Sequence, residues 1–239
     1  MRQLKSAILI YNPTKPHAKA LAGEVRRFLT THGARVVREE KSADALITVS
    51  GDGTLLYHKS RYNLPIFAIG NENSAICQAK ADNWKPMLSR ILQRGFTTEQ
   101  RGMLSCEAGG KVVEDALNEV VIRSRDHRVI DILLGVNGKK FKFLADGVLF
   151  STPTGSTAYC YSCGGRKLPK HARKYEAVAI APYRRAFRPM VLKDSAICAA
   201  STQSRAADLV FDGQFIHRMS PGSKIRVFKS RRAIHLIKT

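Results

Sequence analysis

Short apolar runs alternate with amphipathic stretches along the first hundred residues. The stretches 17–30 and 84–94 space their apolar residues as one face of a helix, and Gly33 and Gly95 follow them as stop signals. In the first helix the expected buried face comprises Ala20, Leu21, Val25, Phe28 and Leu29. The apolar runs predict strands at residues 7–11, 34–37, 45–49 and 64–69. This alternation is typical of a mostly parallel sheet, so we predict an α/β domain over residues 1–100.

The pattern changes after Gln100, where short β-rich runs follow one another with turn residues between them. The pairs Gly109-Gly110 and Asn137-Gly138 predict hairpin turns, the second of type I′. One helix is expected to begin within residues 151–159. The predicted strands are residues 103–107, 116–123, 129–136, 140–144, 177–180, 197–200, 209–211 and 225–228. We predict a β-rich domain over residues 101–223 and a C-terminal strand or tail, 224–239, that packs back on the first domain.

Basic residues outnumber acidic residues by 40 to 19, which gives a formal net charge of +21. Residues 101–239 carry most of this excess, and no acidic residue follows Asp212. A field of this size favours an anionic partner, and a solubilising surface is the alternative explanation.

The apolar run 7–11 is too short for the core of a signal peptide, and no run approaches the roughly 18 residues that span a bilayer. Five cysteines without framework spacing indicate a reducing compartment. Cys160 and Cys163 form a C-x-x-C pair, but the other cysteines supply no second pair, so we expect no metal site there. We therefore expect a cytoplasmic protein with no membrane partner.

The segment Ser50-Gly51-Asp52-Gly53-Thr54 follows a predicted strand and precedes a helical stretch. Such a turn lies where α/β sheets bind ligands, and its small residues let backbone N–H groups approach phosphate oxygens. Asp52 is placed to accept a proton from an attacking hydroxyl or to hold a metal ion. A plain tight turn is the alternative. The chain has neither a Walker A pattern nor G-x-G-x-x-G, which argues against a P-loop enzyme and a standard dinucleotide-binding domain.

Two further groups of polar residues lie in the β-rich half. Asn118-Glu119 interrupts an apolar strand, where an amide and a carboxylate can bind a ribose hydroxyl or a metal-bound water, or simply complete a strand end. Asp146-Gly147 precedes a segment dense in hydroxyl residues, which suits recognition of sugar hydroxyls and a base edge, or capping of a helix. These hydroxyl residues are Ser151, Thr152, Thr154, Ser156 and Thr157, with Tyr159 next.

These three elements, in this order, resemble the NAD kinase family, in which Gly-Gly-Asp-Gly-Thr, Asn-Glu and Asp-Gly followed by Ser-Thr-Pro-Thr-Gly-Ser-Thr-Ala-Tyr recur at similar separations. The last motif is complete here, at residues 151–159. The resemblance covers nearly the whole chain, including Arg188-Pro189 and Asp212-Gly213-Gln214. It implies an N-terminal Rossmann-like α/β domain, a C-terminal sandwich-like β-rich domain, and an active site between them. It also implies ATP-dependent phosphorylation of the adenosine ribose 2′-hydroxyl of NAD.

The resemblance implies roles for individual residues. Asp52 activates the 2′-hydroxyl, while Gly51, Gly53 and Thr54 lie against the phosphates of the donor, which is ATP or polyphosphate. The implied NAD-binding residues are Asn118, Glu119, Asp146, Thr154, Thr157, Ala158, Tyr159 and Ser162, with Asp146 assigned to the nicotinamide carboxamide. Mg²⁺ is implied with ATP. A homodimer or homotetramer is implied because a neighbouring subunit completes the pocket in this family.

The chain departs from the family pattern at two places. Ser50 replaces the usual first glycine, which removes freedom at positive φ. After Ile69-Gly70 the family has an asparagine and a glycine-rich turn ending in Gly-Phe-Leu, whereas this chain reads Asn71-Glu72-Asn73-Ser74-Ala75-Ile76-Cys77-Gln78. We therefore expect this wall of the site to differ in shape.

Two alternative functions remain open from the sequence. A lipid kinase of the diacylglycerol or sphingosine type shares the Gly-Gly-Asp-Gly-Thr motif, although the complete 151–159 motif points away from it. The second is a nucleotide- or nucleic-acid-binding relative that has lost catalysis, which the charge and the basic segment 166–193 favour. We do not expect nucleic acid as a partner, because both reactants of an NAD kinase are polyanions that benefit from the same field.

Overall fold

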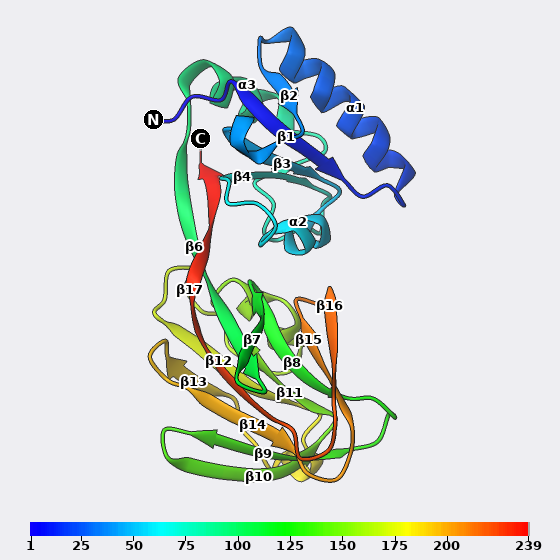
Figure 1. Ribbon diagram of the computed structural model, residues 1–239, viewed down its shortest axis with the longest axis vertical. Helices are drawn as coiled ribbons and strands as arrows, with labels where there is room; N and C mark the ends of the chain where they lie inside the picture. Colours follow the sequence, from blue (N-terminus) through cyan, green and yellow to red (C-terminus); the bar gives the residue numbers. More distant parts are fainter. Residues whose placement is uncertain (239) are drawn as a thin grey trace. The chain divides into compact units, whose positions relative to one another are not determined.

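The computed structural model describes residues 1–238, and the chain divides into two compact units, which are coloured along the sequence in Figure 1. Unit 1 comprises Met1–Gln100 together with the C-terminal residues from Ile234 onward, and unit 2 comprises Arg101–Ala233. The second unit consists almost entirely of strands. The predicted fold class, an α/β domain followed by a β-rich domain, is confirmed.

Unit 1 is built on a parallel sheet whose strands run in the order β4-β3-β1-β2, with the end of β17 beside β4. All residues of β3 and β4 are buried, as expected of apolar strands covered on both faces. The elements of unit 1 are β1 (Ser6–Tyr11), α1 (Pro16–Thr31), β2 (Arg35–Val37), η1 (Glu40–Ser42), β3 (Ala45–Val49), α2 (Asp52–His58), β4 (Ile66–Gly70), β5 (Ala79–Lys80) and α3 (Trp84–Arg94).

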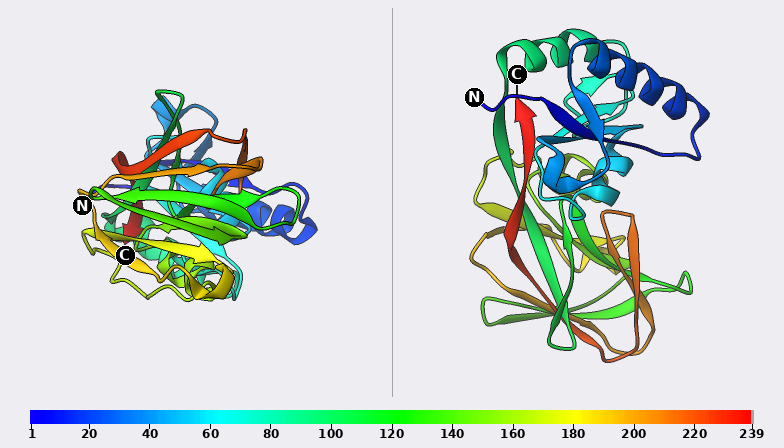
Figure 2. Two further views of the ribbon diagram at one scale, coloured as in Figure 1. Left: turned by 90° about the horizontal axis from the view of Figure 1, so that it is seen from below. Right: turned by 45° about the horizontal axis from the view of Figure 1, so that its top comes forward.

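Two helices, α1 and α3, pack on the same face of this sheet, where Val25, Leu29, Leu88 and Ile91 share one core with alternate residues of β3 and β4. The right panel of Figure 2 shows both helices on one side of the strands and α2 on the other. The buried face of α1 is Ala18, Ala22, Val25 and Leu29. The prediction that Ala20 is buried is wrong, because Ala20 projects from the exposed side of the helix.

Unit 2 is a sandwich of two sheets. One has six antiparallel strands in the order β13-β12-β11-β8-β15-β16, and the strands β10-β9-β14-β17 with β6 and β7 form the other layer. The elements, of which β6 and β17 also include residues of unit 1, are β6 (Thr97–Ala108), β7 (Lys111–Ala116), β8 (Glu119–Ser124), β9 (Ile130–Val136), β10 (Lys139–Ala145), β11 (Gly147–Ser151), η2 (Gly155–Thr157), α4 (Tyr159–Ser162), β12 (Lys174–Ile180), η3 (Tyr183–Arg185), β13 (Met190–Lys193), β14 (Cys198–Thr202), β15 (Ala207–Phe211), β16 (Phe215–Met219) and β17 (Lys224–Lys238).

The large core of unit 2 fills the space between the two sheets, and a smaller one covers the outer face of the six-stranded sheet. In the smaller core, Cys160 of α4 packs on Val121, Leu149, Val178 and Ile180. The short helix α4, which belongs to the motif segment 151–159 and its continuation, therefore covers part of the outer face of the six-stranded sheet.

Two of the expected elements differ in the structure. A helix begins within residues 151–159, as expected, but it is short: β11 continues to Ser151, a single 3₁₀ turn starts at Gly155, and α4, which starts at Tyr159, has only four residues. The strand expected over 116–123 is broken, because β7 ends at Ala116 and β8 begins at Glu119. Asn118 consequently lies in a break between strands, where its backbone and side chain can form hydrogen bonds with groups outside the sheet.

Candidate active site residues

The turn after β3 brings Ser50 and Gly51 to positive φ, at +125° and +109°, before α2 begins at Asp52. A serine in this region of φ is strained, by about 1–3 kcal/mol for such a backbone. The Ser50 hydroxyl oxygen accepts the N–H of Asn12 at 3.0 Å, which ties the turn to the end of β1. The substitution of the family's glycine therefore exchanges backbone freedom for one hydrogen bond.

A pair of variants at Ser50 separates these two effects. Ser50→Ala and Ser50→Gly both lose the bond to Asn12, but only Ser50→Ala keeps a Cβ at positive φ. We expect Ser50→Gly to be more stable than Ser50→Ala by about 1–2 kcal/mol in urea denaturation. Equal stability of the two variants would show that the serine backbone is not strained.

The carboxylate of Asp52 accepts hydrogen bonds from three consecutive backbone N–H groups of the loop that follows β4. Oδ2 lies 2.6 Å from the nitrogen of Ala75, and Oδ1 lies 3.1 Å from the nitrogens of Ile76 and Cys77. This carboxylate also helps to raise the pKa of the Cys77 thiol, although burial of the thiol is the larger cause. Asp52 thus holds the loop 71–78, the segment in which the chain departs from the family pattern.

The neighbours of Asp52 in the turn have different exposures. Gly53 is exposed, whereas Thr54 is buried and its backbone N–H donates to the carbonyl oxygen of Gly51 at 3.1 Å. Thr54 therefore stabilises the turn through its backbone. Gly51 and Gly53 leave the backbone around Asp52 without side chains, which is the feature that suits close approach of a phosphate.

In unit 2, the break at Asn118 is held by Asp212, which was not among the predicted site residues. The Asp212 carboxylate accepts the N–H groups of Leu117, Asn118 and Glu119 at 2.9, 2.6 and 3.1 Å. The side-chain oxygens Oδ1 of Asn118 and Oε2 of Glu119 are buried and have no hydrogen-bond partner within residues 1–238. Buried polar atoms are almost always paired, so these two oxygens are the acceptors that a hydroxyl-bearing ligand would satisfy.

Burial, and secondarily the charge of Asp212, raise the pKa of Glu119 to about 8. The carboxyl group is therefore mostly protonated at pH 7. A protonated carboxyl group donates one hydrogen bond and still accepts others, so Glu119 can serve both the hydroxyl hydrogen and the oxygen of a sugar.

The raised pKa makes the stability of the fold depend on pH. Between the ordinary glutamate pKa and about 8, the folded chain binds more protons at Glu119 than the unfolded chain, so stability falls as pH rises. Each pH unit in this window costs about 1.4 kcal/mol. We expect Glu119→Gln to lose this dependence, so that its melting temperature relative to wild type rises from pH 5 to pH 9. Glu24→Gln, at an exposed position, is the control, and parallel curves for Glu119→Gln and wild type would contradict the raised pKa.

Some hydroxyl side chains of the segment 151–159 form hydrogen bonds within the protein, and others are accessible to a ligand. Thr152 donates through Oγ1 to the carbonyl of Leu117, Ser151 donates to that of Asn118, and Ser156 donates to that of Pro153. The N-cap residues of η2 and α4 make no side-chain cap bond, but Thr152 Oγ1 also accepts the first N–H of η2, from Gly155, at 3.1 Å. Thr154 is half-buried and Thr157 is exposed, which leaves these two hydroxyls free for a ligand.

The backbone of this segment packs directly on the break between β7 and β8. The Thr152 N–H donates to the Asn118 carbonyl oxygen at 2.9 Å, and a Cβ added to Gly155 would lie 2.2 Å from the same oxygen. Asn118 and the 151–159 segment, which are separated in the sequence, therefore form one structure in unit 2.

The remaining predicted residues of unit 2 lie around α4. Ala158 and Tyr159 are half-buried, and Ser162 and Asp146 are exposed. The pKa of Tyr159 is raised, mainly by burial, and the charge of Asp146 contributes to this shift. The predicted residues thus form two groups, one around Asp52 in unit 1 and the other around Asn118 in unit 2.

Glu176 is a second buried carboxyl group that the sequence did not single out. Its Oε2 accepts the N–H of Arg166 at 2.8 Å and the Cys160 thiol at 3.5 Å. It thereby fixes the chain on both sides of the turn that follows α4. Like Asp212, it contacts residues that are not its neighbours in the sequence. An acidic residue within an otherwise apolar strand is the signal by which the sequence could have identified Glu176.

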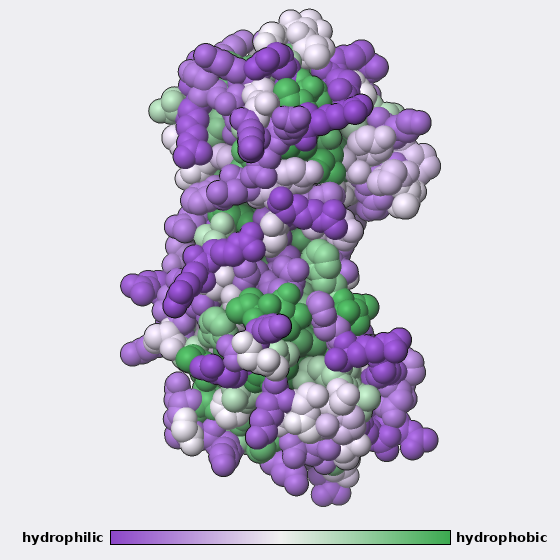
Figure 3. Space-filling model, viewed as in Figure 1, coloured by the Kyte–Doolittle hydropathy of each residue, from purple (hydrophilic) through white to green (hydrophobic). Residues whose placement is uncertain are grey.

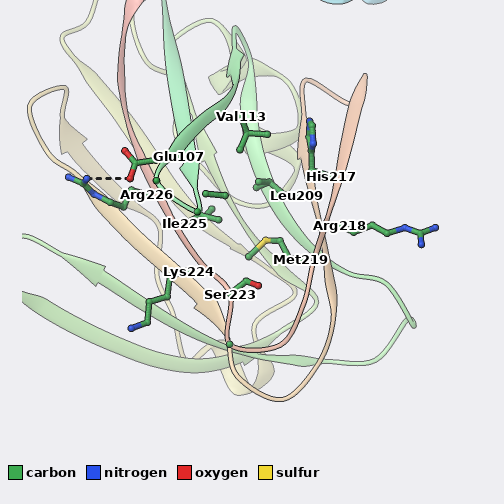
Figure 4. A pocket seen from close by; sticks show the side chains of 14 residues that line it. Glu107, Val113, Leu209, His217, Arg218, Met219, Ser223, Lys224, Ile225 and Arg226 are labelled. Atoms are coloured by element: carbon green, nitrogen blue, oxygen red, sulfur yellow. Dashed lines mark ion pairs between the residues drawn. The ribbon is translucent and has the colours of Figure 1, made fainter.

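A pocket of about 710 Å³ opens in unit 2 away from all of these residues (Figure 4). Val113, Leu209, Met219 and Ile225 gather in it, while Glu107 and Arg226 form an ion pair of 3.6 Å at its edge. Figure 3 shows apolar patches among the polar surface in the region of β7 and β16, and Val112 and Ile216 there are exposed. None of the predicted site residues lines this pocket.

Among residues 1–238, no group of three or more His, Cys, Asp and Glu side chains is arranged to hold a metal ion. Within the same residues, each helix is too short or too polar to cross a bilayer.

A family model described as the ATP-NAD kinase C-terminal domain matches residues 117–239. The NAD kinase of Sulfurimonas denitrificans is 26% identical over 98% of this chain and 92% of its own. The NAD kinase of Aromatoleum aromaticum is 32% identical over 82% of this chain and 69% of its own.

The solved structures that this chain resembles agree with these matches. An NAD kinase from Archaeoglobus fulgidus in complex with ATP is 25% identical, has a TM-score of 0.83, and covers 98% of this chain and 93% of its own. Yeast NADH kinase complexed with NADH has a TM-score of 0.86 at 19% identity, over 100% of this chain and 84% of its own, and shows the likeness of the fold. The matched domain, the identities along nearly the whole length and the shared fold confirm the resemblance of the three motifs: this chain belongs to the NAD kinase family.

Proposed function

We propose that this protein is an NAD kinase, a phosphotransferase that uses ATP to phosphorylate the 2′-hydroxyl of the adenosine ribose of NAD and so produces NADP. The observation that carries this function is the match to NAD kinases over 98% of the chain, and the three motifs in the sequence support it. A lipid kinase or a non-catalytic nucleic-acid-binding relative is not favoured, because the relatives that align over nearly the whole chain are NAD kinases.

In the proposed reaction, Asp52 accepts the proton of the 2′-hydroxyl as the oxygen forms its bond to the γ-phosphorus of ATP. The bond from that phosphorus to the β–γ bridging oxygen breaks, and its electron pair leaves with ADP. A carboxylate has about four acceptor positions, and three are occupied by the N–H groups of residues 75–77. One position therefore remains for the hydroxyl. Gly51 and Gly53 leave room for the donor phosphates, and Thr54 holds the turn.

The adenosine portion of NAD is assigned to the break between β7 and β8. The unpaired oxygens of Asn118 and Glu119 support this assignment, because they offer buried acceptors to ribose hydroxyls. Thr154, Thr157 and Ala158 would line the adenine and ribose, with Tyr159 and Ser162 beside them. Asp146 would accept the N–H₂ of the nicotinamide carboxamide.

Mg²⁺ is proposed to enter with ATP as the MgATP complex. The chain offers no acidic cage among residues 1–238, and Mg²⁺ commonly binds through substrate phosphates with few protein ligands. When bound there, the ion neutralises phosphate charge. The net charge of +21 favours both anionic substrates in the same way.

We further propose a homo-oligomer in the cytoplasm. The five described cysteines are all free, which supports a reducing compartment. Size-exclusion chromatography with light scattering measures the oligomer directly.

The function is tested with purified protein, NAD and MgATP, with NADP read by an NADP-specific dehydrogenase. We expect NADP only when both substrates are present. Parallel reactions with diacylglycerol or sphingosine as acceptor, and filter binding of RNA across salt concentrations, test the alternatives. Phosphorylation of a lipid without NADP formation would overturn the proposal, as would salt-sensitive RNA binding without NADP formation.

A further inference from the structure

Three consecutive backbone N–H groups in unit 1 converge on a single anion. The nitrogens of Ala75, Ile76 and Cys77 all point at the carboxylate of Asp52, at 2.6, 3.1 and 3.1 Å. Successive N–H groups that converge in this way form a concave anion site, and such sites commonly bind phosphate. In this structure the occupant is the side chain proposed as the catalytic base.

The loop is shaped for this convergence by its own side chains. Oδ1 of Asn71 accepts the N–H of Asn73 at 3.0 Å and the hydroxyl of Ser74 at 3.1 Å, and the Ser74 oxygen accepts the N–H of Asn71 at 3.1 Å. Lys80 donates to the carbonyl oxygens of Ser74 and Glu72. With the carbonyls of residues 72 and 74 turned to Lys80, the N–H groups of residues 75–77 are left to face Asp52.

We propose that the N–H groups of residues 75–77 form a phosphate site, which Asp52 fills in the absence of substrate and which a phosphoryl group of the donor takes over. The inference rests on the proposed function, because it places the donor phosphate beside Asp52. The exchange has a mechanistic consequence: when a phosphate takes the place of the carboxylate, all acceptor positions of Asp52, and not only the fourth, become available to the acceptor hydroxyl. Donor binding and release of the base are then one event.

The proposal makes Asp52 an internal competitor of the donor. A ligand that must displace an internal group binds with an apparent affinity reduced by the fraction of protein in which its site is free. Removing the competitor should therefore tighten binding of phosphate. If the three N–H groups instead serve only to orient Asp52, removing the carboxylate should not increase the affinity for phosphate.

The experiment uses inorganic triphosphate as the probe in isothermal titration calorimetry, without NAD. We expect Asp52→Ala to bind the probe about 10-fold more tightly than wild type, since hydrogen bonds to a charged group are the strong ones. Loss of a like charge alone would also tighten binding, so a second substitution separates the two causes. Ala75→Pro removes the N–H that lies nearest to the carboxylate, and Ala75→Gly keeps it.

The gain should disappear in Asp52→Ala/Ala75→Pro and persist in Asp52→Ala/Ala75→Gly, with circular dichroism confirming the fold of each. An Asp52→Ala variant that binds no more tightly than wild type overturns the proposal, as does a gain that survives Ala75→Pro.

If the proline variant does not fold, the amide resonances of residues 75–77 are followed by NMR in Asp52→Ala during the same titration. They should shift more than those of residues 81–83, and equal shifts overturn the proposal. Neither measurement requires turnover, so its failure is distinguishable from failure of the kinase assignment.

Discussion

Asp52→Asn should lower kcat for NADP formation by about 10²- to 10⁴-fold, the range that a positioned general base contributes. The amide keeps the size of the carboxylate but cannot accept the proton of the ribose hydroxyl. KM for NAD should change little, because the residues assigned to NAD lie in unit 2. The measurement is the coupled assay of NADP formation at saturating NAD and MgATP.

The contacts of Asp52 require a control for this variant, since an asparagine has one acceptor oxygen where the carboxylate uses two for the loop. Ser74→Ala loosens the same loop and leaves the carboxylate in place. We expect Ser74→Ala to lose less than about 10-fold in kcat, because the two hydrogen bonds of this hydroxyl, both with Asn71, shape the loop and do not involve the carboxylate. Asp82→Asn, at an exposed position in unit 1, should behave as wild type. An Asp52→Asn variant that keeps a tenth of the activity, or a Ser74→Ala variant that loses as much, would contradict the role of Asp52 as base.

The strands and long helices of unit 1 could be predicted because local pattern decides them. The runs at β3 and β4 are apolar at each position or nearly so, and burial on both faces requires that pattern. The helix α3 has the predicted limits, residues 84 and 94, and Gly95 follows at positive φ. These features need no knowledge of distant parts of the chain.

The hydroxyl-rich segment shows that local pattern can indicate a helix start and still miss the distant partners of its side chains. Its serines and threonines are typical of a helix N-terminus, but Ser151 and Thr152 donate to carbonyl groups more than thirty residues away in the break between β7 and β8. The Thr152 hydroxyl also accepts the N–H of Gly155, the first residue of η2, at 3.1 Å, so one side chain joins the start of that turn to the distant break. The composition of the segment therefore singles it out in the sequence, but its partners and its conformation depend on tertiary structure.

The same limit applies to the carboxylates. Asp52 was identified from its turn, yet its bonds to residues 75–77 depend on the loop after the neighbouring strand β4. Asp212 positions Asn118 and Glu119 from more than ninety residues away in the sequence. Each of these contacts joins backbone groups to one side chain, and backbone groups leave no signal in the sequence. Such positioning acids become visible only when the strands are paired.

The second large effect is expected from substitution of Gly155, whose backbone packs tightly against that of Asn118. Gly155 lies so near the break between β7 and β8 that an added Cβ would be 2.2 Å from the carbonyl oxygen of Asn118. Both groups belong to backbone, so neither can rotate away, and Gly155→Ala must move Asn118 or the 151–159 segment. A displacement of about 1 Å in a binding residue can cost on the order of 10²-fold in activity.

We therefore expect Gly155→Ala to raise KM for NAD by at least about 10-fold while KM for ATP changes less, and to lower the melting temperature by several degrees. Gly102→Ala is the matched control, because an added Cβ there meets nothing within 4 Å and should leave both quantities unchanged. The ratio of the two KM changes is the informative measurement, since a general loss of folded protein lowers activity without altering either KM. A Gly155→Ala variant with normal KM for NAD would show that the position of Asn118 does not control the binding of NAD. The unpaired oxygens of Asn118 and Glu119 would then need another ligand.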